Sequence, residues 1–430
     1  MEPVDIASLK RTAYLNYHSS PGSVINDLHY VLLIMTLPAL LIIAHDTVFK
    51  TSRKWELFTF VIPFGLAFSV PTVYLIPVWV VCATVVAFTI EWDTSKRTFV
   101  SVVAGNRIKM IAEARAIMLF LTSLAIFAVD FPAIFPRSFC KTELYGFSLM
   151  DVGVGLVVFF GSANTKRYNQ STTRSRSSTF LSTVWRTAPA FILGISKFVF
   201  TKESDYYVSS SEYGVHWNFF FTVFVLAILG SLMPENASPR LELAIACASL
   251  AISASISISS QLEWQFFFGD RLTSFFAANR EGIMSCLGYF ALHLSGSAFG
   301  SGLITGGYRA VIMWFCACYA LSMLTIWLGF LPCRRVANLP FVLCSCTVSL
   351  FILIASSLVE SVNPHRSVLS SFLTGILKAP LVFFLAANAL TGLANFTLNT
   401  LEMSFNESFG CIVAYITLLW IISMALYIRK

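Results

Sequence analysis

One segment combines a carboxylate, two prolines and two basic residues directly after an apolar stretch. Residues 128–155 read AVDFPAIFPRSFCKTELYGFSLMDVGVG, and Lys141 follows Asp130 by 11 positions. Pro132 and Pro136 forbid a regular helix between them, so the segment is expected to fold back and bring Asp130 and Lys141 together. A carboxylate there can act as general base for a hydroxyl nucleophile, and an ammonium can stabilise the oxyanion of an acyl-transfer intermediate.

Asp130 and Lys141 are therefore the candidate catalytic residues. The alternative is a structural ion pair at a helix boundary, which the same spacing also permits. Arg137, between them, is a candidate for binding a substrate phosphate, because guanidinium groups bind phosphates through paired hydrogen bonds.

A second polar stretch, EYGVHWNFF at 212–220, leads into an apolar segment. Its candidate substrate-binding residues are Glu212, His216, Trp217 and Asn218, with His216 as an acid/base group or a headgroup contact. An aromatic belt at a membrane interface, with its polar groups satisfied locally, is the alternative explanation.

Four further candidates precede apolar segments, in AANREGIMSCLGY at 277–289 and RRVANLP at 334–340. Asn279 is suited to cap a helix, and Arg280 either pairs with Glu281 or contacts a phosphate. Arg335 and Asn338 are the candidates in the second motif.

Asn388 and Asn395 lie about two turns apart on one apolar helix. Interhelical hydrogen bonds are the first expectation for both side chains, and substrate contact is the second.

The familiar motifs of soluble enzymes do not occur in the sequence. It contains no GxxxxGK phosphate loop, no GxSxG elbow and no HExxH zinc helix, and its 10 cysteines include no CxxC pair. Neither a metal site nor a disulfide scaffold is expected. The first 27 residues contain no short apolar core followed by a cleavage site, so a removable signal peptide is not expected either.

The elements that must position these residues lie in a membrane. The chain is 57% hydrophobic and only 12% charged over 430 residues, whereas soluble domains carry roughly 25% charged residues. The net charge of +7 is spread between apolar segments, as the positive-inside rule predicts, and does not indicate nucleic acid.

The apolar segments predict an all-α, polytopic transmembrane helical bundle with about 13 spans, forming a single domain over residues 1–430. The prolines at 63, 71 and 77 leave open whether residues 57–91 cross once or twice. The expected spans are 28–45, 57–70, 71–91, 113–129, 146–162, 187–200, 216–232, 240–259, 284–300, 308–331, 337–359, 376–398 and 408–428.

The distribution of Lys and Arg predicts the orientation. Alternate loops carry nine such residues on the side of the amino terminus and seventeen on the other side, which is therefore expected to be cytosolic. Residues 164–186, rich in Ser, Thr and Arg, are then a flexible cytosolic loop. The polar amino-terminal segment 1–27 and the segment 130–145 lie on the opposite side.

With these motifs in view, the chain resembles the glycosylphosphatidylinositol-inositol acyltransferases, the PIG-W family. The resemblance rests on the blocks at 128–155, 212–220, 278–289, 334–340 and 387–400, the last reading ANALTGLANFTLNT. It implies an enzyme of the endoplasmic reticulum membrane that moves a fatty acyl chain, typically palmitoyl, from acyl-CoA to the inositol of glucosaminyl-phosphatidylinositol. The segments 1–27 and 130–145 would then face the lumen.

The resemblance also places the acidic and basic catalytic pair of the family on Asp130 and Lys141. Two departures affect their spacing: DFPAIFPR is one residue longer than the family's DFPxFPR, and Ser138 replaces a second arginine. The partners implied are membrane lipid, glucosaminyl-phosphatidylinositol and acyl-CoA as co-substrate, with no permanently bound cofactor, no metal and no obligatory protein partner.

A transporter or flippase for a lipid or small solute is the alternative of a different class. Such proteins are often built from internal repeats with paired broken helices. No repeat is visible in this sequence, and the polar clusters are all expected on one side of the membrane.

Overall fold

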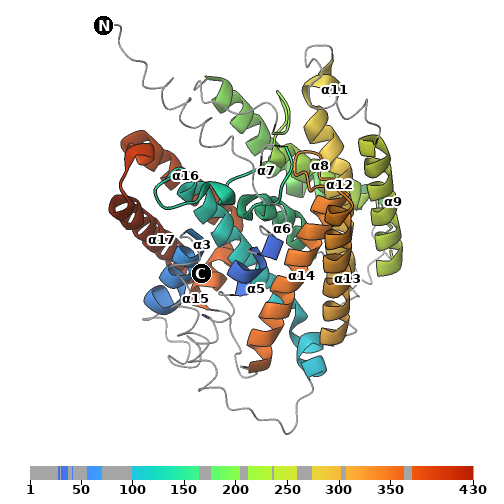
Figure 1. Ribbon diagram of the computed structural model, residues 1–430, viewed down its shortest axis with the longest axis horizontal. Coiled ribbons are helices and arrows are strands. Elements are labelled where there is room, and N and C mark those ends of the chain that lie inside the picture. Colours follow the sequence, from blue (N-terminus) through green and yellow to red (C-terminus); the bar gives the residue numbers. More distant parts are fainter. Residues whose placement is uncertain are drawn as a thin grey trace.

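The computed structural model describes residues 28–29, 31–36, 41, 56–69, 99–142, 144–163, 176–203, 212–234, 237–258, 274–301, 307–362 and 370–429. Every regular element within these ranges is helical (Figure 1). In chain order they are η1 (Leu57–Val61, a π-helix), α3 (Ile62–Ser69), α5 (Phe99–Ala128), η3 (Arg137–Phe139, a 3-10 helix), α6 (Leu149–Ala163), α7 (Arg176–Glu203), α8 (Phe219–Ser231), α9 (Pro239–Ile258), α11 (Phe275–Ala278), α12 (Arg280–Ser301), α13 (Gly307–Trp327), α14 (Leu339–Val362), α15 (Ser371–Lys378), α16 (Pro380–Thr397), η6 (Thr400–Glu402) and α17 (Phe405–Ile428).

Several of these helices are long and apolar enough to cross a membrane. Within the described ranges they are Lys109–Ala128 of α5, Arg309–Trp327 of α13, Leu339–Ser357 of α14, Pro380–Thr397 (α16) and Phe405–Ile428 (α17). Leu149–Ala163 (α6) and Phe219–Ser231 (α8) are shorter apolar helices. The all-α fold is thus confirmed over the described residues, and these helices are consistent with a polytopic membrane protein, whereas the count of about 13 spans stays a prediction.

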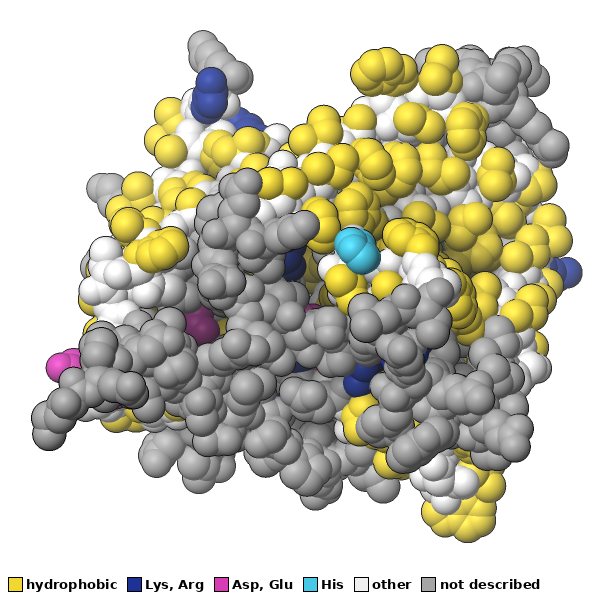
Figure 2. Space-filling model, turned by 90° about the horizontal axis from the view of Figure 1, so that it is seen from above, with side chains coloured by type: hydrophobic (Ala, Val, Ile, Leu, Met, Phe, Trp, Pro, Cys, Tyr) yellow, Lys and Arg dark blue, Asp and Glu magenta, His cyan; other side chains and the backbone are white. Residues whose placement is uncertain are grey.

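The helices divide into an inner and an outer group. Of the apolar segment that could span the membrane, 72% is buried inside the protein in α5 and α14, against 17% in α13 and α16 and 28% in α17. Some of the largest side chains of the outer helices are exposed: Trp327 is 80% exposed and Phe396 is 86% exposed. Hydrophobic side chains cover much of the described surface in Figure 2. Such a surface suits lipid and not water, because large apolar patches are rare on soluble proteins.

Two glycines allow the inner helices α6 and α12 to pack closely. A Cβ added at Gly296 would collide with the backbone oxygen of Phe159, and one at Gly300 with that of Ala163. This G-x-x-x-G spacing permits close backbone approach between helices in lipid. Because both residue numbers increase in the same direction along the contact, the two helices run parallel, and their amino-terminal ends lie at the same end of the bundle.

The structure corrects three expected boundaries. Helix α5 begins at Phe99, 14 residues before the expected span at 113–129, because its first half is too polar to register as a membrane span. The single span expected at 376–398 is broken into α15 and α16, where Pro380 starts a new helix at its first position. Residues 176–186 of the expected loop 164–186 belong to helix α7.

The remaining part of that loop, 164–175, lies outside the described residues, as do the segment 1–27 and the expected span 71–91. The serine-rich end of the expected span 240–259 is helical in α9 as far as Ile258. There Ser255 donates to the carbonyl of Ala251 at 2.8 Å, which is how an intramembrane serine satisfies its hydroxyl.

Candidate active site

Asp130 lies in the turn that follows helix α5. The helix ends at Ala128, and irregular backbone carries the chain past Pro132 to η3. The carboxylate oxygen Oδ2 of Asp130 accepts a hydrogen bond of 2.8 Å from Nδ2 of Asn395 on α16. Burial raises the pKa of Asp130 to about 6, although the hydrogen bond from Asn395 opposes this shift. A carboxyl group with that pKa is suited to accept a proton near neutral pH.

Lys141 lies just beyond η3 and points to a different carboxylate. Its ammonium Nζ donates to Oε1 of Glu212 at 2.8 Å. The structure does not support the alternative of an ion pair between Asp130 and Lys141, because each side chain has its own partner from a distant segment. The prolines do fold the chain back, but the two side chains bind to different neighbours.

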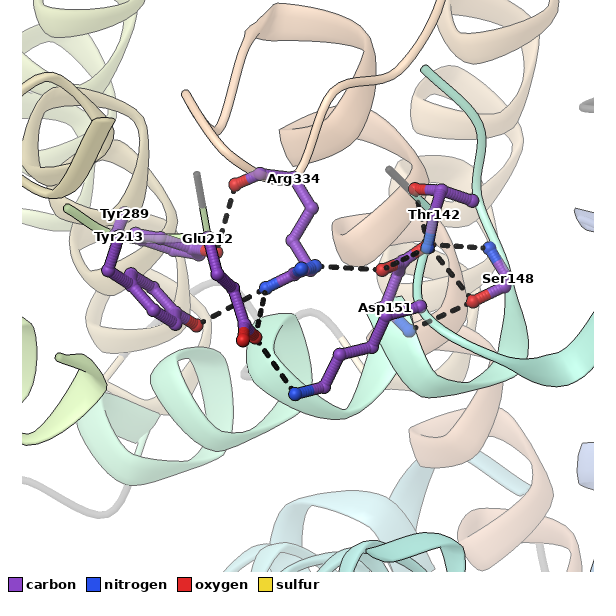
Figure 3. Close-up of polar contacts among 8 residues, drawn as sticks. Thr142, Ser148, Asp151, Glu212, Tyr213, Tyr289 and Arg334 are labelled. Atoms are coloured by element: carbon purple, nitrogen blue, oxygen red, sulfur yellow. Dashed lines mark hydrogen bonds and ion pairs between the residues drawn. The ribbon is translucent and has the colours of Figure 1, made fainter. Parts of the chain in front are cut away.

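Glu212 is one member of a continuous charge network formed by Lys141, Glu212, Arg334 and Asp151 (Figure 3). Arg334 Nη1 lies 3.1 Å from Glu212 Oε1, and its Nε lies 2.8 Å from Asp151 Oδ1. The side chain of Arg334 is only 3% exposed and that of Asp151 is 0% exposed. Buried charges are tolerated when they are paired and hydrogen-bonded, as these are.

Asp151 is fixed by hydrogen bonds as well as by Arg334. Its Oδ2 accepts from the backbone amides of Thr142 and Ser148 at 3.2 and 3.0 Å, and from both hydroxyls at 2.8 and 3.0 Å. Asp151 lies in the first turn of α6, where the positive end of the helix dipole favours a carboxylate. These contacts attach the chain segment around Lys141 to the start of α6.

Two tyrosines contact Arg334, Tyr213 at the guanidinium and Tyr289 at the backbone oxygen. The Tyr213 hydroxyl lies 3.5 Å from Nη1, and the guanidinium carbon lies 5.8 Å from the ring centroid. Tyr289 on α12 donates to the backbone oxygen of Arg334 at 3.2 Å. Burial would lower the pKa of Arg334, but the carboxylates of Glu212 and Asp151 outweigh it and raise that pKa further.

The same neighbours keep Glu212 ionised. Burial alone would raise its pKa, but Lys141 and Arg334 lower it well below the usual range. Glu212 thus carries a negative charge throughout the physiological pH range, and this charge is paired with the two cations Lys141 and Arg334. That arrangement does not support the expected role of Glu212 as a direct substrate ligand.

A second buried cluster lies beside the charge network. Arg335 Nη2 is 3.0 Å from Glu281 Oε1, and Arg280 Nε is 3.8 Å from the same oxygen. All three side chains are at most 5% exposed. The local pairing of Arg280 with Glu281 is confirmed, and Arg335 joins it from another segment.

Asparagines shape the loops that carry these arginines. Asn338 accepts from the backbone amides of Cys333 and Phe341 and donates to the carbonyl of Leu331. It thereby closes the loop in which Ala337 has φ 48°. Asn279 does not cap α12 through its side chain: its Oδ1 accepts from the backbone amide of His216 at 2.8 Å.

The candidates at 216–218 also have structural partners. Asn218 caps α8 by accepting from the amides of Phe220 and Phe221, and Trp217 donates to Thr222 at 2.9 Å. The exposed ring of His216 packs near those of Phe198 and Phe275. These contacts support the interpretation of an interfacial belt.

The two asparagines of α16 differ. Asn388 donates to the carbonyl of Phe384 in its own helix at 2.7 Å, whereas Asn395 reaches Asp130 on another segment. Only Asn395 bonds to a residue outside its own helix, as expected for an asparagine that joins separate segments of the bundle. Arg137, the first residue of η3, is half-buried.

The segments that carry these candidates lie at one end of the bundle. Glu212 meets Lys141 and Arg334, Arg335 meets Glu281, and Asn395 meets Asp130. These residues come from segments that the alternation of spans assigns to the same side of the membrane. Three charged residues of the site, Asp151, Glu281 and Arg334, were not predicted as site residues. The two carboxylates could have been found, because acidic residues at the starts of apolar helices are a recognisable signal.

The fold is that of a helical membrane protein. At one end of its bundle it carries a carboxylate without an ion-pair partner among the described residues and an ion-paired ammonium, and ionisable groups at such positions usually mark a functional site. Comparison with known proteins narrows the class. The chain matches the family model described as GWT1 over residues 11–426.

Its relatives cover most of the chain. It is 33% identical over 371 residues to "GPI-anchored wall transfer protein 1" of Candida albicans, covering 75% of each protein. It is 31% identical over 363 residues to the protein of that name from Saccharomyces cerevisiae, covering 73% of this chain and 72% of the relative. An uncharacterized protein of Arabidopsis thaliana is 32% identical over 339 residues.

The chain belongs to the GWT1 family. This membership confirms the resemblance to the PIG-W enzymes and the enzyme class that it implied, an inositol acyltransferase of GPI-anchor biosynthesis. The transporter alternative is thereby set aside.

Proposed function

We propose that this chain, in the endoplasmic reticulum membrane, transfers a long acyl chain such as palmitoyl from acyl-CoA to an inositol hydroxyl of glucosaminyl-phosphatidylinositol, with Asp130 as base. The observation that carries the assignment of Asp130 is its position: a half-buried carboxylate, bonded on one oxygen by Asn395 and with no ion-pair partner among the described residues. Such a carboxylate is more basic than an ordinary aspartate.

The reaction needs one proton acceptor and one stabilised oxyanion. The inositol oxygen attacks the thioester carbonyl carbon while its proton moves to Asp130, and a new C–O bond forms. The carbonyl oxygen takes the negative charge, and when the intermediate collapses the C–S bond breaks. The proton then passes from Asp130 to the departing thiolate, which leaves as CoA, and the carboxylate is restored.

Lys141 supplies the positive charge for the oxyanion. Its ammonium has three donor hydrogens, of which one is directed to Glu212, and the side chain is 42% exposed. The remaining donors can turn toward a substrate. The ion pair with Glu212 holds the ammonium in place, and a donor that is already oriented costs little reorganisation when the charge develops.

The phosphates of the two substrates require cations near this end of the bundle. Arg137, half-buried at the start of η3, is the arginine nearest in sequence to both catalytic candidates. We assign it to the phosphate of either substrate. Arg280 and Arg335 are buried against Glu281, so we assign them to the shape of the site and not to direct contact.

The test is acyl transfer in microsomes supplied with labelled acyl-CoA and glucosaminyl-phosphatidylinositol. Asp130→Asn and Lys141→Ala should each lower the rate by about 10²–10³ or more at matched expression. Glu402→Gln is a matched control, since Glu402 is an exposed carboxylate bonded only to Asn399. Its activity should equal wild type.

The double variant separates catalysis from structure. If Lys141 were needed only to balance the charge of Glu212, with which it pairs, the double variant Lys141→Ala, Glu212→Gln would recover activity. A catalytic Lys141 predicts an inactive double variant. Acyl transfer near the wild-type rate in Asp130→Asn or in Lys141→Ala would remove that residue from the mechanism.

A further inference from the structure

The hydrogen bond between Asn395 and Asp130 joins two distant parts of the chain, the loop after α5 and the last turn of α16. Its length is 2.8 Å, and Asn395 is half-buried. The amide donates to Oδ2 of Asp130, and Oδ1 has no hydrogen-bond partner among the described residues. One carboxylate oxygen is therefore fixed, and the other remains available to take a proton.

The position of Asn395 on α16 follows from the buried face of that helix. Phe383, Ala387 and Thr391 recur every four residues and are at most 6% exposed. Asn395 continues this row by one more turn, because side chains four residues apart share a helix face. The next residue, Phe396, is 86% exposed. The buried face thus extends from apolar packing to a single amide at the level of Asp130.

Buried contacts hold this face in place. Thr391 lies 3.4 Å from the hydroxyl of Tyr415 on α17, and Tyr415 in turn donates to the carbonyls of Ser123 on α5 and Ala387 on α16. One hydroxyl thus bridges the three helices a single turn away from Asn395. These contacts fix α16 beside α5, and so hold Asn395 within reach of the loop that carries Asp130.

We propose that Asn395 is a positioning residue that orients the carboxylate of Asp130 for proton transfer, an inference that rests on the function proposed above. A carboxylate without a fixed donor would rotate between orientations, and misplacement of a reacting group by about an ångström lowers the rate strongly. The amide is a suitable donor because it is neutral: a cation at the same place would make the carboxylate a much weaker base.

The bond also adjusts the basicity of Asp130, which gives the proposal a measurable signature. The amide stabilises the charged carboxylate and so opposes the rise in pKa that burial causes. The titratable groups on neighbouring segments have other partners among the described residues: Lys141 pairs with Glu212, Tyr415 bonds backbone carbonyls, and Glu402 and Glu407 bond Asn399 and Ser404. A change at Asn395 should therefore be felt mainly by Asp130.

The experiment is the pH dependence of kcat/KM for acyl transfer in Asn395→Leu and Asn395→Asp. For a base, activity appears as pH rises through its pKa. Without the amide, the acid limb should move up by about one pH unit. The rate near pH 6 should then fall about fivefold more than the rate above pH 8. Asn395→Asp keeps the shape but adds a second carboxyl group, and should move the limb further.

Thr397→Val is the matched control. Thr397 lies in the same turn of α16, and its hydroxyl bonds the carbonyls of Leu393 and Ala394 in its own helix. The substitution also removes the glycosylation sequon Asn395-Phe396-Thr397, so it controls for any effect of a glycan. Its acid limb should coincide with that of wild type.

The possible outcomes are distinct. A rate loss that is equal at all pH values, with an unmoved limb and a raised KM, would make Asn395 a substrate contact and overturn the proposal. An inactive Asn395→Leu protein does not end the test, because the isosteric Asn395→Asp still reports the limb. If wild type itself fails to acylate inositol, the proposed function fails; if wild type acylates and neither variant moves the limb, only the role of Asn395 fails.

Discussion

Replacing Arg334 by methionine should destabilise the protein more than replacing any exposed cation. The guanidinium lies between two carboxylates, 2.8 Å from Asp151 and 3.1 Å from Glu212, and is 3% exposed. Its removal leaves Asp151, which is 0% exposed, without a cation. Breaking a buried ion pair from one side costs about 3–5 kcal/mol, because the remaining charge stays desolvated.

A second ion pair in the same charge network allows the loss of stability to be compared. The pair of Lys141 and Glu212 is 42% exposed on the lysine side, and exposed pairs contribute at most about 1 kcal/mol. Lys141→Met should therefore leave the stability almost unchanged, whereas Arg334→Met should lower it several-fold more. Arg334→Lys keeps the charge but cannot reach both carboxylates with one planar group, and should fall between the two.

The assay is retention of the monodisperse peak in size-exclusion chromatography after heating in mild detergent. Arg309→Met is the control, since Arg309 is an exposed arginine at the start of α13. Neutralising the partners as well, in the triple variant Arg334→Met, Asp151→Asn, Glu212→Gln, should recover part of the loss. Equal midpoints for Arg334→Met and Arg309→Met would refute the reasoning.

Three further predictions concern Asp130 and the orientation of the chain. Burial raises the pKa of Asp130 from 3.8 to about 6, so the folded state holds this proton more tightly and the stability of the protein falls as pH rises from about 4 to about 6. Asp130→Asn should therefore be inactive yet more heat-stable than wild type above pH 6, by up to about 3 kcal/mol. A stability difference from wild type that does not depend on pH would contradict this. Single cysteines at 138–143, on a background without native cysteines, should react with an impermeant label only from the lumenal side, and cytosolic labelling would reverse the orientation. Glycosidase treatment should not change gel mobility, because the sequons at Asn169 and Asn236 fall in expected cytosolic loops, Asn395 lies in α16 and Asn406 lies in the first turn of α17. A shift abolished by Asn169→Gln would indicate an inverted topology.

The sequence was sufficient to predict which polar segments share a side of the bundle, because this depends only on the parity of the spans. Apolar segments of membrane length alternate the polar loops between two sides, so the segments around Lys141, Glu212 and Arg334 had to share a side. The contacts among these residues agree with that expectation. This alternation was enough to place the polar segments of the site at the same end of the bundle, whatever the total number of crossings.

Which side chain bonds to which could not be predicted from hydropathy. The partner of Lys141 depends on the rotation of each helix about its axis, and that rotation is set by close packing such as the approach of Gly296 and Gly300 of α12 to the backbone of α6. Asp151 was overlooked for a related reason: it stands in the first turn of a strongly apolar helix, and its partner Arg334 is 183 positions away.

The separate partners of Asp130 and Lys141 have a chemical consequence. A direct ion pair between them would lower the pKa of Asp130 and weaken it as a base, and would occupy the ammonium before substrate arrives. With separate partners, Asp130 keeps a pKa of about 6 beside the neutral amide of Asn395. The ammonium of Lys141 pairs with Glu212 at 2.8 Å. Base and oxyanion donor can then act on opposite ends of the same reacting pair, the hydroxyl and the thioester carbonyl, without neutralising each other. The proposed mechanism therefore requires the two groups to be near each other in the bundle and bonded elsewhere.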